Sequence, residues 1–261
     1  MYYSSKKEQI KIYFGKRMRS FLYEKRWMSI IATAIIAFII VFVTGDGLFA
    51  DQSDTKRGAF TLICACIWSG LFNSIQNICK EREIIKHEYR EGLILSAYIT
   101  AHMLFDFIVC VLETIIISVI VFINYAHNIS GVFGMIGIML TILIATYCSD
   151  ALGILVSSIV KTPQIAMNTM PFILIFQLAF AGLIFELEGA SARIGYLTIS
   201  KWGYEAILSL CNMRQVWSWS SLDFENQSAA LPTCWFFMIL FTVGYAFLSA
   251  LLLRLVEHDK R

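Results

Sequence analysis

Charged side chains are scarce in this chain: Lys, Arg, Asp and Glu make up only 15% of its 261 residues, whereas 58% are hydrophobic. The mean hydropathy of +0.68 is that of a chain with more apolar surface than a soluble fold can bury. The composition therefore excludes an ordinary soluble domain and indicates a protein that is dissolved in lipid.

The motifs of nucleotide and metal chemistry are also missing. The sequence holds no GxxxxGK[ST], HExxH or GxSxG and no paired His/Cys cluster. We therefore expect no catalytic, cofactor or metal site, and no ATPase within these residues. The seven cysteines lie mostly in apolar runs without CxxC spacing, which favours buried small side chains. Only Cys211 and Cys234 could face an oxidising compartment, and the sequence leaves their pairing open.

Long uncharged runs are what the sequence does have. A hydrocarbon core of roughly 30 Å needs about 20 helical residues, and continuous rather than alternating runs indicate helices and not a barrel. The third uncharged run, residues 114–126, is too short by itself. It reaches this length only if it is extended back through Glu113 and Asp106 to about Ala97. The prediction is an all-α membrane protein with six transmembrane helices, formed by residues 27–45, 58–79, 97–126, 129–149, 162–185 and 226–253.

The distribution of Lys and Arg predicts the orientation. Alternate segments between the runs hold 16 and 5 of the 21 basic residues, which places both termini and the 80–90 loop in the cytoplasm. The first run follows eight basic residues and is interpreted as an uncleaved anchor. The expected location is the cell membrane, with multiple passes and an external segment at about 186–231. The N-x-S sequons at Asn128 and Asn226 then lie outside.

Two charged segments flank the first two runs on the predicted cytoplasmic side. Residues 10–26 place apolar side chains at helical spacing opposite basic ones, among them Arg17 and Arg26, which predicts an amphipathic helix at the membrane surface. Residues 80–92, KEREIIKHEYREG, form a short charged helix that ends at a glycine. The predicted organisation is a cytoplasmic helix at 1–26, a membrane domain at 27–256 and a cytoplasmic tail at 257–261.

Ionisable residues also occur within the apolar runs. His102, Asp106 and Glu113 share one predicted helix and lie near one face of it, and Asp150 ends the fourth run. Such groups are costly in lipid and need partners. An interhelical hydrogen-bond network is the favoured interpretation, and a proton relay or metal pair is the alternative.

Three stretches together resemble a known family: IWSGLFNSIQNICKEREIIKHEYREG with its continuation LILSAYITAHMLFD, then KTPQIAMNTMPFILIFQLAFAG, and YLTISKWGYEAILSL. They are similar to the permease domain of type-2 ABC exporters of the G subfamily. The bacterial forms whose ATPase often carries a forkhead-associated domain are the nearest. The resemblance extends from about residue 9 to 256.

The resemblance implies a connecting helix at residues 10–26, a cytoplasmic coupling helix at about 80–92 and external re-entrant helices before the last span. It assigns contact with the ATPase to the polar residues of the coupling helix, which are Glu81, Arg82, Glu83, Lys86, Glu88 and Arg90. It assigns a substrate path to Trp68, Phe72, Phe176, Gln177 and Phe180. Gly182, which would allow close helix approach, forms an apolar gate with Leu183 and Ile184.

By this resemblance the chain is a permease subunit that exports an amphipathic or lipid-like substrate by alternating access. The implied partners are an ABC ATPase subunit, a second copy of the chain and membrane lipids, with no nucleic acid. ATP and Mg are expected on the ATPase and no cofactor on this chain. Two other classes stay open: an ion-coupled transporter that uses the four intramembrane groups, and a membrane scaffold for a cytoplasmic ATPase.

Overall fold

The computed structural model describes residues 5–24, 26–45, 48–50, 52–129, 131–185, 189–211 and 231–255. Within these ranges the chain forms helices and no strand, which confirms the all-α prediction. The order is α1 (Lys6–Tyr23), α2 (Met28–Thr44), α3 (Gln52–Ser74), α4 (Asn77–Arg90), α5 (Leu95–Tyr125), η2 (Ala126–Asn128), α6 (Gly131–Ile159), α7 (Pro163–Ala179), α8 (Ala190–Gly195), α9 (Ile199–Cys211) and α10 (Leu231–Leu255). The predicted tail at 257–261 and the sequon at Asn226 lie outside the described residues.

Several of these helices are long and apolar enough to cross a membrane. Four segments in the described part of the chain meet that requirement, namely Ser53–Arg90, Leu95–Asn128, Gly131–Ile159 and Leu231–Arg254. The pair α1 and α2, bent by 66°, makes a fifth if it is counted as one broken span. Helices α2 and α7 have only 17 residues each, short of the about 20 that a crossing needs. A multi-pass protein is thus supported, and the count of six stays a prediction.

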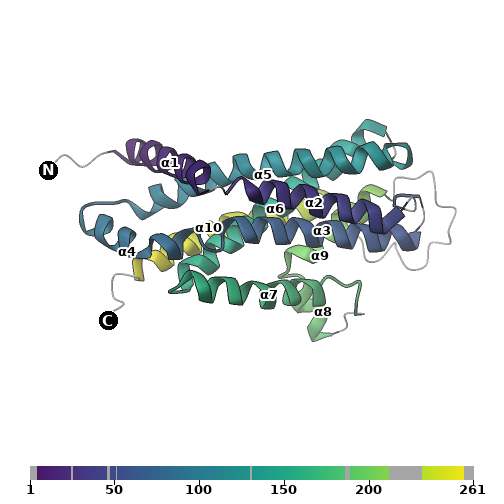
Figure 1. Ribbon diagram of the computed structural model, residues 1–261. Coiled ribbons are helices and arrows are strands. Elements are labelled where there is room, and N and C mark those ends of the chain that lie inside the picture. Colours follow the sequence, from purple (N-terminus) through teal and green to yellow (C-terminus); the bar gives the residue numbers. More distant parts are fainter. Residues whose placement is uncertain are drawn as a thin grey trace.

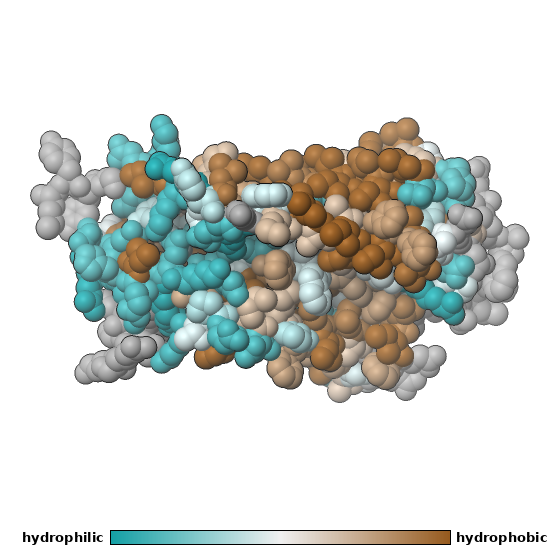
Figure 2. Space-filling model, viewed as in Figure 1, coloured by the Kyte–Doolittle hydropathy of each residue, from teal (hydrophilic) through white to brown (hydrophobic). Residues whose placement is uncertain are grey.

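The helices run roughly side by side in one bundle (Figure 1). Helices α1 and α4 and the last turn of α10 lie at one end, called the α4 end below. A broad apolar band covers the middle of the visible face, and hydrophilic side chains gather over α1 and α4 (Figure 2). This is the surface expected of a helix bundle that crosses a bilayer with its α4 end in water.

The centre of the bundle is the close crossing of α3 and α6. A β carbon built on Gly70 of α3 would lie 2.8 Å from the backbone nitrogen of Asp150 on α6, and one on Gly153 would overlap the Ser74 hydroxyl. Glycine at these two positions therefore lets the two backbones approach closely, as small residues do in membrane helix pairs.

Helix α7 ends earlier than the sequence predicts. Its last residue is Ala179, whereas the apolar run continues to residue 185. Gly182 lies beyond the helix with a φ of +89°, a left-handed conformation that favours glycine. The predicted role of Gly182 in helix approach is therefore corrected: its backbone conformation makes the turn that follows α7. Two short helices, α8 and α9, then precede α10, and their external re-entrant placement stays a prediction.

Candidate functional site

Helix α4, which contains most of the predicted coupling helix, begins at Asn77 and is anchored on α6. The hydroxyl of Ser157 accepts hydrogen bonds from the backbone nitrogens of Ile78 and Cys79, at 3.0 and 3.1 Å. The Arg82 guanidinium donates to the backbone oxygen of Val160 at 2.9 Å and is 9% exposed. Arg82 thus satisfies a backbone group just after the carboxyl end of α6, and its predicted role toward the ATPase stays a prediction.

Helix α1 is fastened to α4 and α5 on its other side. Lys16 pairs with Glu81 at 3.1 Å, and the same carboxylate oxygen accepts a hydrogen bond from the Tyr98 hydroxyl at 3.0 Å. The Tyr13 hydroxyl donates to Glu88 at 2.8 Å, and burial, followed by this hydrogen bond, raises the pKa of Tyr13. Movement of α4 would therefore be passed to both α1 and the start of α5.

One face of α4 has no such internal contacts. The Glu83 side chain is 82% exposed and, within the described part of the chain, pairs with its neighbour Lys86 at 3.4 Å. Ile84 is 47% exposed, and His87 pairs with Glu91 at 3.4 Å on the surface. Of the predicted coupling residues, Glu83 and Arg90 lie on the exposed surface, and Glu81 and Arg82 do not. The sequence did not single out Ile84 as an exposed apolar side chain, although an isoleucine one helical turn before Glu88 on a charged helix was the available signal.

Arg17 corrects another expectation. The amphipathic pattern placed it on the solvated face of α1, but it is 5% exposed and pairs with Asp106 of α5 at 3.3 Å. An acidic side chain in a membrane helix needs a partner, and Arg17 supplies it from outside that helix. Phe14 and Phe21 pack against Phe105 on either side of this pair, with ring centroids 5.9 and 5.4 Å apart.

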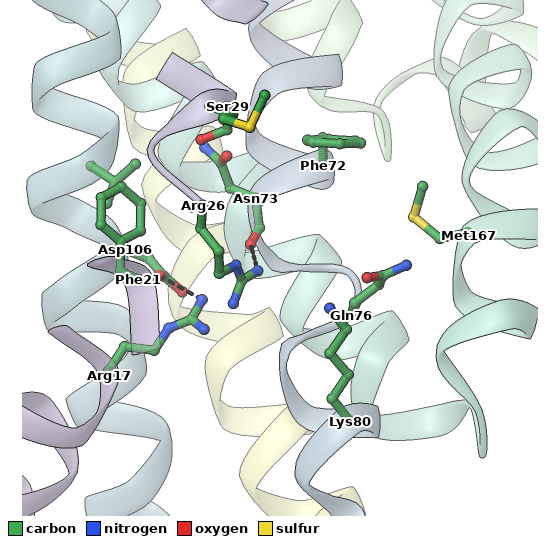
Figure 3. A pocket seen from close by; sticks show the side chains of 12 residues that line it. Arg17, Phe21, Arg26, Ser29, Phe72, Asn73, Gln76, Lys80, Asp106 and Met167 are labelled. Atoms are coloured by element: carbon green, nitrogen blue, oxygen red, sulfur yellow. Dashed lines mark hydrogen bonds and ion pairs between the residues drawn. The ribbon is translucent and has the colours of Figure 1, made fainter. Parts of the chain in front are cut away.

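A pocket of about 260 Å³ opens next to this ion pair, between the α1–α2 bend, α3, α4, α5 and α7. Figure 3 shows Arg17 and Arg26 turned toward each other from opposite sides of the bend, with Lys80 below them. Arg26 donates to the backbone oxygen of Asn73 at 2.9 Å and to the side-chain oxygen of Asn77. Burial, and after it the neighbouring Arg17, lowers the pKa of Arg26 to about 10, against the opposing effect of Asp106.

The four predicted intramembrane groups have different surroundings. Glu113 joins three helices: it accepts hydrogen bonds from Ser69 at 2.7 Å and Asn73 at 2.9 Å on α3, and from Thr33 at 3.3 Å on α2. Asp106 also accepts from Asn77, at 3.5 Å. These two form the interhelical network that the sequence predicts.

The other two groups of the set do not belong to that network. His102 packs against the Tyr98 ring, with centroids 4.4 Å apart, and its Nδ1 has no partner among the described residues. Neither carboxyl oxygen of Asp150 has a partner there, although the residue is fully buried. The described residues also contain no group of three or more His, Cys, Asp or Glu side chains that could hold a metal ion.

The predicted path residues divide into surface and core. Trp68, Phe72 and Phe176 are 44–48% exposed on α3 and α7, and Phe180 packs against Phe176 with centroids 4.9 Å apart. Gln177 is instead 3% exposed, and its side-chain oxygen accepts from the backbone nitrogens of the first two residues of α9, at 2.9 and 3.2 Å. Its contacts are those of a cap that joins α7 to α9.

The two predicted gate residues after α7 differ in exposure. Leu183 packs against the core, whereas Ile184 is 53% exposed. Neither Cys211 nor Cys234 forms a disulfide, and neither do the other five cysteines, so the structure has no disulfide at the pair that the sequence left open.

Comparison with known proteins identifies the family. Residues 8–212 match the family described as the ABC-2 type transporter. The chain belongs to this family. The matched region includes α1, α4 and the α3–α6 crossing. These helices therefore belong to the permease-type membrane component of an ABC transporter.

One curated relative of this ABC-2 protein is an ABC transporter ATP-binding/permease protein of Mycobacterium tuberculosis, strain ATCC 25618 / H37Rv. The two are 23% identical over 146 residues, which covers 54% of this chain and 17% of the relative. The chain therefore spans about a sixth of the length of that protein.

Proposed function

We propose that this chain is the permease subunit of an ATP-driven exporter and that a separate ABC ATPase docks on the exposed face of α4. The observation that carries the proposal is the double attachment of α4. Its buried side is held by α6, α1 and α5 through Arg82, Glu81 and Glu88, while Glu83, Ile84 and His87 face outward. A helix fixed in this way transmits force from a partner to three other helices at once. ATP and Mg would bind to the ATPase, and the α4 end would lie in the cytoplasm.

In the proposed mechanism two copies of the chain face each other across α3 and α7 and alternate between inward-open and outward-open states. The exposed aromatic side chains Trp68, Phe72 and Phe176 support this arrangement, because apolar surface on two neighbouring helices suits both a second copy and an amphipathic substrate. Leu183 and Ile184, beyond the turn at Gly182, are the proposed gate. The G-subfamily assignment and the lipid-like substrate belong to the same proposal.

The test is the change Ile84→Glu on the exposed face of α4. We expect the tagged variant to insert into the membrane normally but to recover about tenfold less ATPase subunit than the unchanged chain, because a charge replaces an apolar contact residue. The matched control is Ile194→Glu, which changes an exposed isoleucine on α8, away from the α4 end. Equal recovery of the ATPase with both variants would refute the docking face.

Reconstituted transport separates the remaining classes. An ion-coupled transporter would move substrate in vesicles without ATPase or nucleotide. A scaffold would recover the ATPase but show no transport when ATP is added. The proposed exporter requires both the ATPase and ATP.

A further inference from the structure

The pocket beside Arg17 carries an excess of positive charge that the protein itself does not neutralise. Three cationic side chains line it, Arg17, Arg26 and Lys80, and Asp106 is the one carboxylate among its lining residues. Arg17 and Asp106 neutralise each other at 3.3 Å. Arg26 donates only to uncharged oxygens of Asn73 and Asn77. Lys80 is exposed, and its side chain has no hydrogen bond or ion pair among the described residues. Asp106, Glu24 and Asp150 act on Arg26 through space, but neither Arg26 nor Lys80 is in an ion pair within the described part of the chain, so both can pair with a bound anion.

A buried donor in the same pocket is also unsatisfied. The Nε of Arg17 has no hydrogen-bond partner in the part of the chain that the structure describes, although this side chain is only 5% exposed. Leaving a buried donor of a charged group without an acceptor is costly. An anion in the pocket would lie beside the two guanidinium groups that Figure 3 shows facing each other and would stabilise both of them.

The remaining wall of the pocket combines uncharged polar side chains, those of Ser29, Asn73 and Gln76, with an apolar part at the edge of the membrane band. Met28 and Phe72 line it and are 59% and 44% exposed, and Met167 of α7 closes the opposite side. Figure 2 shows the hydrophilic surface of the α4 end meeting the apolar band over this part of the bundle. The volume of about 260 Å³ holds roughly nine water molecules, which suits a phosphate-sized headgroup and leaves an attached chain to extend along Phe72.

We propose that this pocket binds the anionic headgroup, phosphate or carboxylate, of an amphipathic molecule whose apolar tail lies along α3 and α7. The proposal rests on the proposed export function and gives its substrate class: Arg17, Arg26 and Lys80 receive the headgroup where the membrane surface meets the α4 end. Because Lys80 belongs to α4 and Arg26 joins α1 to α2, movement of α4 changes the distance between the charges that hold the anion. Substrate release and ATPase action would thus be coupled at this pocket.

The experiment is calorimetric titration of the purified full chain in uncharged detergent, with three probes. The probes are dioctanoyl phosphatidic acid, dioctanoyl phosphatidylcholine and inorganic phosphate. We expect saturable binding of the phosphatidic acid, no saturable binding of the zwitterionic lipid, and at least about tenfold weaker binding of phosphate, which lacks the tail. Lys80→Glu should weaken phosphatidic acid binding about tenfold, because it replaces an attractive charge by a repulsive one. Lys80 has no internal partner among the described residues, so this variant keeps its fold.

The control is Lys11→Glu, the same change of charge at an exposed position on α1 outside the pocket. Arg26→Gln is a second variant and should also weaken binding. Equal affinity of Lys80→Glu and Lys11→Glu, or equal binding of the anionic and zwitterionic lipids, would overturn the proposal. Phosphate that binds as tightly as phosphatidic acid would show a site for a free anion and also overturn it. The titration contains no ATPase or nucleotide, so a failure of ATPase docking leaves this result unaffected, and a failed titration leaves the permease proposal standing.

Discussion

At the scale of single residues, Glu113 and Asp150 are both fully buried carboxyl groups, but only Glu113 has side-chain partners. Ser69, Asn73 and Thr33 surround Glu113 from α2 and α3. The sequence indicated that a carboxyl group in this span needs partners, because burial without them is too costly. It could not name them, since all three lie on other helices, 40 to 80 residues away along the chain.

We predict that Glu113→Ala lowers the free energy of unfolding by about 2–3 kcal/mol, because it leaves the Asn73 amide without its acceptor and leaves the Ser69 and Thr33 hydroxyl groups only each other as partners. Glu113→Gln keeps the shape and one acceptor and should cost about half as much. Unfolding of the purified protein by SDS, followed by circular dichroism, measures both. An alanine variant as stable as the unchanged chain would show that these hydrogen bonds contribute nothing to the bundle.

At the scale of elements, the crossing of α3 and α6 and the anchoring of α4 determine which parts can move together. The crossing depends on glycine, whereas the anchor depends on one serine and one arginine. The sequence predicted α4 as a charged helix but treated Arg82 as a residue for the partner. Its actual acceptors are at the end of α6, some 76 to 78 residues further along the chain, which helical spacing does not reveal.

We predict that Gly70→Ala destabilises the protein by about 1–3 kcal/mol, since its methyl group would meet the backbone of α6 at Thr146 and Asp150. Gly244→Ala is the matched control: a β carbon there meets no atom within 4 Å, so stability should be unchanged or slightly increased. Thermal unfolding in detergent compares the two. Equal melting temperatures of the two variants would contradict a close crossing of α3 and α6 at Gly70.

We predict that Arg82→Ala lowers transport-linked ATPase activity about tenfold while the chain still inserts into the membrane, because α4 loses its attachment to the end of α6. Adding Glu81→Ala, which removes the pair with Lys16, should lower the activity further. Arg254→Ala, at an exposed arginine of the last turn of α10, is the control. Unchanged coupling in the Arg82 variant would count against α4 as the transmitting helix.

At the scale of the whole molecule, the distribution of basic residues predicts which end of the bundle faces the cytoplasm. Sixteen of the 21 Lys and Arg residues belong to segments on the predicted cytoplasmic side. The structure brings α1 and α4 together at one end, with α8 toward the other (Figure 1). The two charged helices that the sequence predicts on one side of the membrane thus share one end of the bundle.

We predict that a membrane-impermeant maleimide labels Ala190→Cys on α8 in intact cells but labels His87→Cys on α4 only after the membrane is permeabilised. Both positions are exposed. The unchanged chain, whose seven cysteines are buried or half-buried, gives the background. Labelling of His87→Cys in intact cells would reverse the orientation and remove α4 from the cytoplasmic ATPase.

The sequence by itself determined that this protein is dissolved in lipid, that it is helical and roughly where its charged helices lie, because hydropathy, helical spacing and charge are local along the chain; the bounds of α1 and α4 differ from the predicted ones by a few residues. Tertiary structure alone decided that Arg17 leaves the solvated face of α1 to meet Asp106, that Gln177 caps α9, and that α7 stops before Gly182. The first two depend on a partner that is distant in the sequence, and the third on the backbone conformation of a glycine just after the helix. The pocket between Arg17, Arg26 and Lys80 exists for the same reason, since its charges come from three segments that only the fold brings together.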